Sequence, residues 1–186
     1  ARYQELSRAE RILSEYLDVV LAQLSDADRV LAREVLKALV TSRDMKDRLS
    51  LADLARALTM PEADVQRVAD GLVAARLLRR TDEAYELVHD FLARRVREWL
   101  DEGERALKEA QEMLRREVDG WQARRLSLSR GEMLLVDRQR DRLRPSDEEL
   151  ALVAYSAVLH DVSAEAWLGR LPDSTAVLLL LLGDED

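Results

Sequence analysis

Residues 84–100 read Ala-Tyr-Glu-Leu-Val-His-Asp-Phe-Leu-Ala-Arg-Arg-Val-Arg-Glu-Trp-Leu. At the start of this stretch, Tyr85 and Leu87 fall on one side of the chain and Glu86 on the other, an alternation typical of an edge strand. The period then changes from two to about 3.6. Apolar or small residues follow in steps of three and four, as on one stripe of a helix, at positions 96, 100, 103, 107, 110, 114, 118 and 121. The stretch therefore predicts a strand that passes directly into a helix.

One of the two histidines in the chain, His89, lies at this joint. The first backbone N–H groups of a helix have no partner within the helix, so a helix start attracts anions, above all phosphate groups. A histidine beside that start is well placed to bind a phosphate. Histidine serves many roles, however, and the alternative is that His89 only caps the helix and packs against it.

The segment Tyr-Glu-Leu-Val-His-Asp-Phe-Leu-Ala-Arg-Arg at residues 85–95, followed by Trp99, resembles the end of the winged-helix domain in bacterial STAND-class NTPases. These are signalling ATPases related to the NACHT and NB-ARC switch proteins. The resemblance extends over roughly the whole chain and is clearest over residues 26–100. It implies that His89 reaches back to the nucleotide phosphates in the resting state, with Asp90 as its neighbour. It also implies ADP or ATP with Mg²⁺ as cofactors of the parent protein, and none in this fragment.

The composition favours long surface helices over sheets. Of the 186 residues, 35% are charged and 4% are aromatic, whereas strands are enriched in aromatic and β-branched residues. The net charge of −8 disfavours a surface for nucleic acid or for an anionic membrane. The chain has no cysteine, which excludes disulfides and favours a cytoplasmic protein. We expect neither a signal peptide nor a membrane span.

The order of elements over residues 26–88 predicts a winged helix-turn-helix. A hydroxyl followed three positions later by a carboxylate is typical of helix starts, and this pattern occurs at Ser7, Ser25, Ser50, Ser129 and Ser146. These starts and the apolar spacing behind them predict helices near residues 8–24, 26–41, 51–58 and 62–75. Residues 77–80 and 85–88 flank a polar turn and predict a β-hairpin wing. Three helices and a hairpin in this order form a helix-turn-helix with a wing.

Three parts follow from these predictions. Residues 1–25 would form a leading helix joined to the NTPase region of the parent, residues 26–100 the winged-helix domain, and residues 101–186 a helical arm. The apolar stripe predicts one helix from Asp90 to Trp121, of roughly 30 residues. Leucines seven positions apart on it would permit a coiled-coil dimer, but packing against the C-terminal helices is favoured. The tryptophans are predicted to be core residues: Trp99, Trp121 and Trp167.

Further helices are predicted near residues 130–143, 147–160, 163–170 and 174–182. The second histidine, His160, also precedes an aspartate, but it closes a helix, where a basic ring near the negative end explains its presence. Residues 176–182 are apolar on every side, so we expect neighbouring repeats to bury them, or the segment to self-associate without those repeats. The repeat array is implied by the resemblance, because the chain shows no fixed sequence period.

Motifs for catalysis are missing from the sequence. There is no Gly-x-x-x-x-Gly-Lys-Ser/Thr phosphate loop, and two distant histidines without cysteine do not suggest a metal site. We therefore expect a non-enzymatic regulatory fragment of a STAND NTPase, without catalytic or metal-binding residues. Its winged helix would lock the ADP-bound resting state, and its arm would couple that lock to sensor repeats. The expected partners are the NTPase domain of the parent and the downstream helical repeats.

The rival hypothesis is a winged-helix transcription regulator that dimerises through the 90–121 helix. The third helix of the winged helix would enter the major groove of DNA. Three acidic residues and two basic ones lie along it: Glu62, Asp64, Asp70, Arg67 and Arg76. Acidic side chains repel the phosphate backbone. The charge pattern thus favours a winged helix that packs against protein, and no nucleic acid is expected as a partner.

Overall fold

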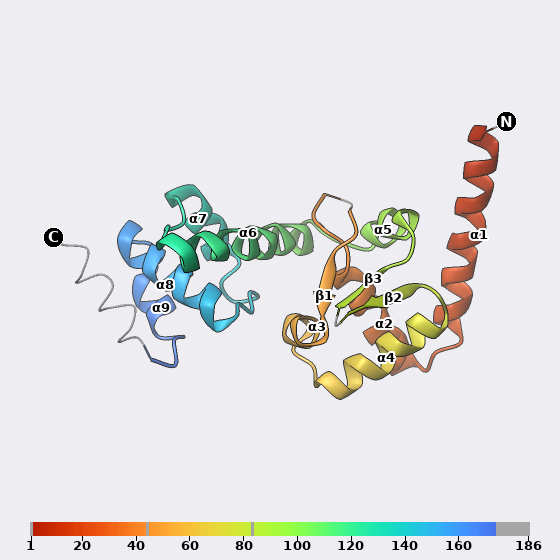
Figure 1. Cartoon of the computed structure of the whole chain (residues 1–186), viewed down its shortest axis with the longest axis horizontal. Helices are drawn as coiled ribbons and strands as arrows, with labels where there is room; N and C mark the ends of the chain where they lie inside the picture. The colour runs from red at the N-terminus through yellow and green to blue at the C-terminus, as the bar shows by residue number, and fades with distance from the viewer. Residues whose placement is uncertain (1, 44, 83, 174–186) are drawn as a thin grey trace. The chain divides into compact units, whose positions relative to one another are not determined.

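The computed structural model describes residues 2–43, 45–82 and 84–173, and their side chains from residue 11 onward. The chain divides into two compact units, Ala1–Glu102 and Gly103–Asp186 (Figure 1). The first contains, in order, α1 (Arg2–Ala22), α2 (Asp26–Ala38), β1 (Arg48–Ser50), α3 (Leu51–Leu58), α4 (Glu62–Ala74), β2 (Leu78–Thr81), β3 (Ala84–Leu87) and α5 (Asp90–Arg97). The helices that follow are α6 (Glu102–Arg124), α7 (Arg130–Arg138), α8 (Asp147–His160) and α9 (Ala164–Leu168). The described part is mainly helical, as predicted, with one small sheet.

Helix α1 belongs to the core of the first unit, because Leu17 and Leu21 are buried in the same apolar cluster as the helices that follow. The helix begins at Arg2, so Ser7 lies inside it and the predicted helix start at Ser7 is wrong. A hydroxyl three positions before a carboxylate is common by chance in so acidic a chain. The residues before Ser7 are good helix formers, which allows the helix to extend toward the N-terminus.

Two of the predicted helix starts in the first unit are confirmed. The Ser25 hydroxyl accepts a hydrogen bond from the Asp28 N–H at 3.2 Å, and the Ser50 hydroxyl accepts one from the Asp53 N–H at 3.1 Å. Helix α2 ends at Ala38, three residues before the predicted end. The chain leaves the helix there because Val40 forms a β-bridge with Lys46.

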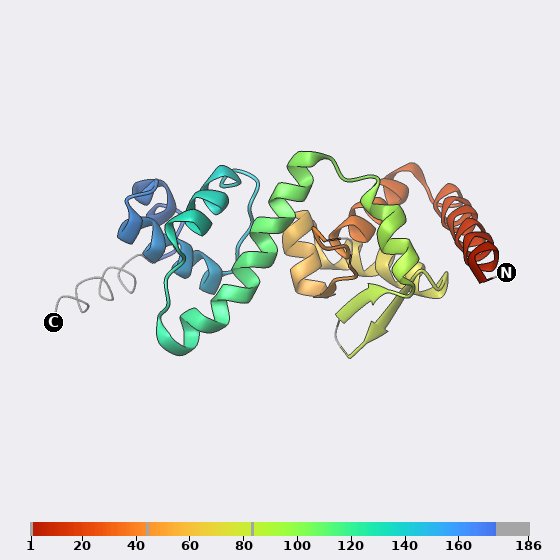
Figure 2. The same cartoon turned by 90° about the horizontal axis from the view of Figure 1, so that it is seen from above.

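The sheet has three antiparallel strands in the order β1-β3-β2. Strand β3 is therefore central, and the prediction that it is an edge strand is wrong. Its partners are β2, which forms the predicted hairpin, and β1, which the sequence did not predict; Leu49 of β1 pairs with Tyr85. The alternation along β3 is confirmed, since Tyr85 and Leu87 are fully buried. Figure 2 shows the β2–β3 hairpin projecting from the helices of this unit.

The long helix predicted from Asp90 to Trp121 is broken. Helix α5 ends at Arg97 and α6 begins at Glu102 (Figure 2). In the linker, Trp99 and Leu100 donate their N–H groups to carbonyls three residues back, at 3.0 and 2.9 Å, in place of the four-residue spacing of an α-helix. Trp99 packs against the core of the first unit, and the Arg33 guanidinium lies 5.0 Å from its ring centre. Tertiary packing of Trp99 thus ends a helix that local sequence would continue.

The second unit has its own apolar core. Ala110, Met113, Leu114 and Trp121 of α6 are buried in one cluster with residues of α7, α8 and α9, so the favoured packing of this stripe against the C-terminal helices is confirmed. Helix α8 is buried on nearly every side, at residues 149–150 and 152–157. Trp121 and Trp167 are core residues, as predicted, and Trp121 stacks at a tilt on Tyr155 with ring centres 5.0 Å apart.

Both predicted helix starts in the second unit are confirmed as complete capping boxes, at Ser129 with Glu132 and at Ser146 with Glu149. The predicted helix at residues 174–182, and with it the apolar segment 176–182, lies outside the described residues. Among the residues that the structure describes, no helix combines the length and the apolar character that crossing a membrane requires.

Candidate functional site

The joint between β3 and α5 is held on both sides by hydrogen bonds of the backbone. Before the joint, the Val88 N–H donates to the Leu77 carbonyl at 3.1 Å, which extends the hairpin ladder by one bond. After it, the Leu92 N–H donates to the His89 carbonyl at 3.1 Å and closes the first turn of α5. His89 itself is extended, with φ −120° and ψ 137°. The predicted passage from strand to helix is confirmed.

Helix α5 is anchored by its inner face. Leu92, Ala93 and Val96 are buried in the core of the first unit. Burial of each large apolar side chain contributes about 1.5–3 kcal/mol, so the helix start cannot shift without a substantial loss of stability. His89 and Asp90 are therefore exposed residues at the start of a helix whose other face is anchored in the core.

The His89 side chain is exposed and makes no capping hydrogen bond to the first turn of α5. His89 occupies the N-cap position of α5 through its backbone alone, without a capping bond from its side chain. An imidazole ring has a hydrogen-bond donor in either protonation state, because neutral histidine keeps one N–H. The helix start that follows His89 directly in the chain has backbone N–H groups of the kind that bind anions.

Asp90, predicted as the neighbour of His89 at the site, has a different setting. Its Oδ1 lies 2.9 Å from Nζ of Lys46, in the turn between α2 and β1. The Asp90 side chain is 84% exposed and that of Lys46 is 23% exposed, so the ion pair contributes no more than a surface pair does, about 0–1 kcal/mol. Its carboxylate also lies in the positively polarised first turn of α5. We interpret Asp90 as a brace for the joint, while His89 faces solvent.

Lys46 is the residue of this joint that the sequence analysis missed. The turn that carries it is closed by three hydrogen bonds: Thr41 N–H to Met45 O at 2.8 Å, Met45 N–H to Thr41 Oγ1 at 3.0 Å, and Asp47 N–H to Leu39 O at 2.9 Å. Sequence spacing cannot reveal that this turn and the start of α5 meet, because 44 positions separate Lys46 from Asp90 (90 − 46). Within the described ranges, no group of three or more His, Cys, Asp or Glu side chains could hold a metal ion.

Several arginines on the surface that would face DNA form ion pairs with neighbouring carboxylates. On α4, Arg67 contacts Asp28 at 2.8 Å, and its hydrogen bond, followed by that from Ser25, holds the pKa of Asp28 below the usual range. In the sheet, Arg79 contacts Glu86 at 2.7 Å and Arg48 contacts Asp82 at 2.9 Å. Guanidinium groups held by carboxylates present little net charge to a phosphate backbone. The 90–121 helix, through which the rival hypothesis places dimerisation, is not continuous, because α5 ends at Arg97 and α6 begins at Glu102.

Residues 1–127 match the family described as novel STAND NTPase 1. The match covers more than half of the 186 residues, and the chain belongs to this family. It includes the whole first unit, with the joint at His89, and ends between α6 and α7. No curated protein and no solved structure matches the chain.

Proposed function

We propose that the chain is a regulatory region of a STAND NTPase, in which a winged helix holds the resting state of the switch. The order of α2, α3 and α4 with a three-stranded sheet supports a winged helix, in which the β2–β3 hairpin is the wing and β1 is the short strand that completes the sheet. Membership of the STAND family supports its place in such a switch. The paired basic residues on α4 and the sheet favour protein as its partner.

The observation that carries the proposal is the exposed His89 ring at a rigid helix start. The fold uses neither a cap from this side chain nor its burial, so the residue is available to a partner. In the resting state His89 would donate a hydrogen bond to a phosphate of ADP held by the NTPase domain of the same parent chain. Asp90, paired with Lys46, would keep the start of α5 in the orientation that this bond requires.

The residues of the joint fit one contact to a nucleotide and not a complete nucleotide site. His89 supplies a donor and α5 supplies N–H groups, whereas the phosphate loop that would enclose ADP or ATP with Mg²⁺ does not occur in this sequence. The bound nucleotide would supply the negative charge that distinguishes the two states. The bond from His89 would stabilise the closed packing, and its loss would shift the population toward a state in which the winged helix moves as one body.

The helical arm is proposed to transmit this movement. Helix α6 and the helices after it share one apolar core, so they would move together with little internal deformation. We propose that the arm couples the winged helix to downstream repeats that sense a signal, and that the region itself performs no catalysis.

The test is made in the full-length parent protein, with His89→Ala. A hydrogen bond to a charged phosphate is worth about 1.5–3 kcal/mol, so ADP release should become roughly ten- to a hundredfold faster, and basal activity should rise. His89→Gln keeps an N–H donor and should restore part of the retention. Retention and activity equal to those of the unaltered parent would remove the sensing role.

A control variant separates sensing from folding. His160→Ala removes the other histidine, which lies outside the joint and bonds the Leu128 carbonyl, and should leave ADP release unchanged at temperatures where the protein stays folded. Equal acceleration by both variants would mean that loss of stability, and not loss of a phosphate contact, causes the release.

A further inference from the structure

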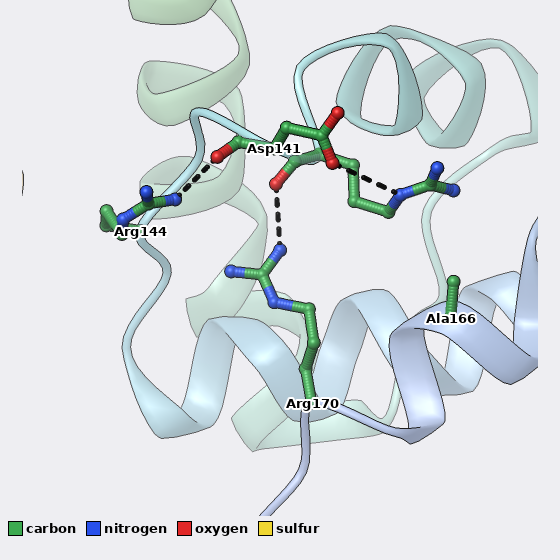
Figure 3. A pocket seen from close by; sticks show the side chains of 5 residues that line it. Asp141, Arg144, Ala166 and Arg170 are labelled. Atoms are coloured by element: carbon green, nitrogen blue, oxygen red, sulfur yellow. Dashed lines mark hydrogen bonds and ion pairs between the residues drawn. The ribbon is translucent and has the colours of Figure 1, made fainter.

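A second candidate site lies in the C-terminal unit, outside the family match. It is a cavity of about 350 Å³ lined by five residues, Arg140, Asp141, Arg144, Ala166 and Arg170 (Figure 3). The first three lie between α7 and α8, and the last two lie in or just after α9. Its volume is at the lower end of the range for small-molecule sites, about 300–1,000 Å³.

The segment that forms one wall is unusually basic for this acidic chain. Residues 138–144 read Arg-Gln-Arg-Asp-Arg-Leu-Arg, with four arginines and one aspartate, while the whole chain has a net charge of −8. Two of these four arginines line the cavity, and Arg170 joins them from a position 26 residues further along the chain (170 − 144). The fold thus brings Arg170 to a basic segment that is distant from it in the sequence.

The position of Arg170 is fixed by the protein itself. Its Nη1 donates to the Arg140 carbonyl at 2.9 Å and its Nη2 to the Leu143 carbonyl at 3.0 Å. Figure 3 shows the first of these two bonds. Its guanidinium also lies 4.9 Å from the ring centre of Trp167, which is fully buried. These bonds use two of the five N–H donors of the group. A guanidinium fixed in this way loses little conformational freedom when it binds a ligand.

Arg144 is also held at the rim, because its Nη1 donates to the Asp141 carbonyl at 2.8 Å and to the Leu143 carbonyl at 3.0 Å. Asp141 compensates the positive charge only weakly: its side chain is 95% exposed, and its Oδ1 is 3.9 Å from Nε of Arg140. Arg140 is also paired with Asp137, whose Oδ1 accepts from its Nη1 at 3.2 Å, so the positive charge of the cavity comes mainly from Arg144 and Arg170.

The charges around Arg170 also favour binding of an anion. Burial, followed by the charge of Arg144, lowers the pKa of Arg170; Asp141 opposes this, and Arg140 adds a further, smaller decrease. Positive charges that oppose one another in this manner lower the stability of the empty cavity. An anion placed among them would remove that repulsion and would add charge-assisted hydrogen bonds.

We propose that this cavity binds the phosphate group of a small anionic ligand. Arginine forks match the spaced oxygens of phosphate, and Arg144 and Arg170 each keep N–H donors beyond those in their bonds to backbone carbonyls. The site is independent of the proposed role of His89, because it lies beyond residue 127, in the part of the chain without a family match.

The experiment is calorimetric titration of the whole chain with inorganic phosphate and, separately, with pyrophosphate, at fixed low ionic strength. One anion should bind per chain, and Arg144→Gln should weaken binding about tenfold, the effect of one charge-assisted hydrogen bond. Asp141→Asn should strengthen it several-fold, because it removes the opposing carboxylate. Tighter binding of pyrophosphate would assign the site to diphosphate esters, and equal binding would assign it to single phosphate groups.

The matched control is Arg142→Gln, which removes the same charge from the same turn at an exposed residue that does not line the cavity. It should change the dissociation constant by no more than about twofold, the screened effect of one remote charge. Equal losses in Arg142→Gln and Arg144→Gln, several weak sites per chain, or no binding of either anion would overturn the proposal and leave an adventitious ion only. Circular dichroism of each variant checks that it is folded.

Discussion

The two histidines of this chain share a sequence context, since each is followed by aspartate, but the fold uses them in opposite ways. His89 precedes a helix, and its side chain is exposed without a cap bond. His160 ends a helix, and its Nε2 lies 2.7 Å from the Leu128 carbonyl, 32 positions away in the chain. The sequence analysis explained His160 by the helix dipole, whereas the structure shows a specific contact to a loop. The contact of His160 with Leu128 accounts for that histidine. No such contact accounts for His89, which is why we propose a ligand for it.

The region around His160 is a closed network. Ser156, fully buried, accepts from the Leu128 N–H at 2.9 Å and donates to the Leu152 carbonyl at 2.8 Å. Both backbone groups of Leu128 are thus bonded to α8, one through Ser156 and one through His160. Beside His89, the Asp90 side chain forms an exposed ion pair with Lys46. The difference predicts unequal effects of substitution in the two regions.

The largest effect is expected for Ser156→Ala. It leaves the buried Leu128 N–H without its acceptor, and an unsatisfied buried donor costs about 1–3 kcal/mol. Urea denaturation followed by tryptophan fluorescence measures the loss, because Trp121 and Trp167 lie in the same core. The control is Ser127→Ala, which removes a half-buried hydroxyl from the loop itself. Similar losses in both variants would show that the network does not hold the loop.

A smaller loss is expected for His160→Ala. The ring is only partly buried, so water can replace part of its bond to Leu128, and we expect about 1 kcal/mol. The exposed neighbouring residue provides the control variant, Leu159→Ala, which should change the free energy of unfolding less. An unchanged free energy of unfolding in His160→Ala would mean that the bond to Leu128 contributes nothing, and the helix dipole would remain as the explanation for this residue.

For Asp90→Asn we expect a loss of about 0–1 kcal/mol, because the pair with Lys46 is exposed. The double-mutant cycle with Lys46→Gln measures the coupling between the two side chains. A coupling of several kcal/mol would mean that the joint depends on this pair more than its exposure allows.

The smallest effect on stability is expected for His89→Ala, within about 0.5 kcal/mol in the isolated chain, as for other surface substitutions. The same denaturation measurement applies. If the variant loses as much stability as His160→Ala, the contrast between the two histidines is wrong and His89 has a structural role.

The stability of the first unit should also depend on pH through Asp28. The pKa of Asp28 is below its ordinary value of about 3.9 in the folded protein, because of the hydrogen bonds from Arg67 and Ser25. The unfolded chain therefore binds more protons, and this contribution to stability, present at neutral pH, is lost as the pH falls below about 4. Asp28→Asn should make the first unit less sensitive to this change in an acid titration followed by NMR. An unchanged acid dependence would remove Asp28 from the account.

Sequence reasoning succeeded where the signal was local. The alternation at Tyr85 and Leu87 and the hydroxyl caps depend on spacings of two to four residues. These features are confirmed, apart from the helix start predicted at Ser7. It failed where distant parts of the chain meet. Strand β1 has three residues, too few to show a period, so the central place of β3 was missed. No glycine or proline lies at the break after Arg97. We attribute the break to the packing of Trp99 against the core, which local sequence does not reveal.

The candidate site divides in the same manner. The position of His89 at a strand-to-helix joint followed from the sequence, but its exposure and the Asp90–Lys46 brace depend on how α5 meets the turn before β1. The arginine cavity was not foreseen at all, since Arg170 reaches Arg140 only through the packing of α9. A basic run such as residues 138–144 was its only signal in the sequence.

The most direct test of the central claim is the rate of ADP release from the full-length parent, measured side by side for His89→Ala and His160→Ala. The account predicts release at least about tenfold faster for His89→Ala, the equivalent of one charge-assisted hydrogen bond, and an unchanged rate for His160→Ala. An unchanged rate in His89→Ala would contradict the nucleotide-sensing role of the joint.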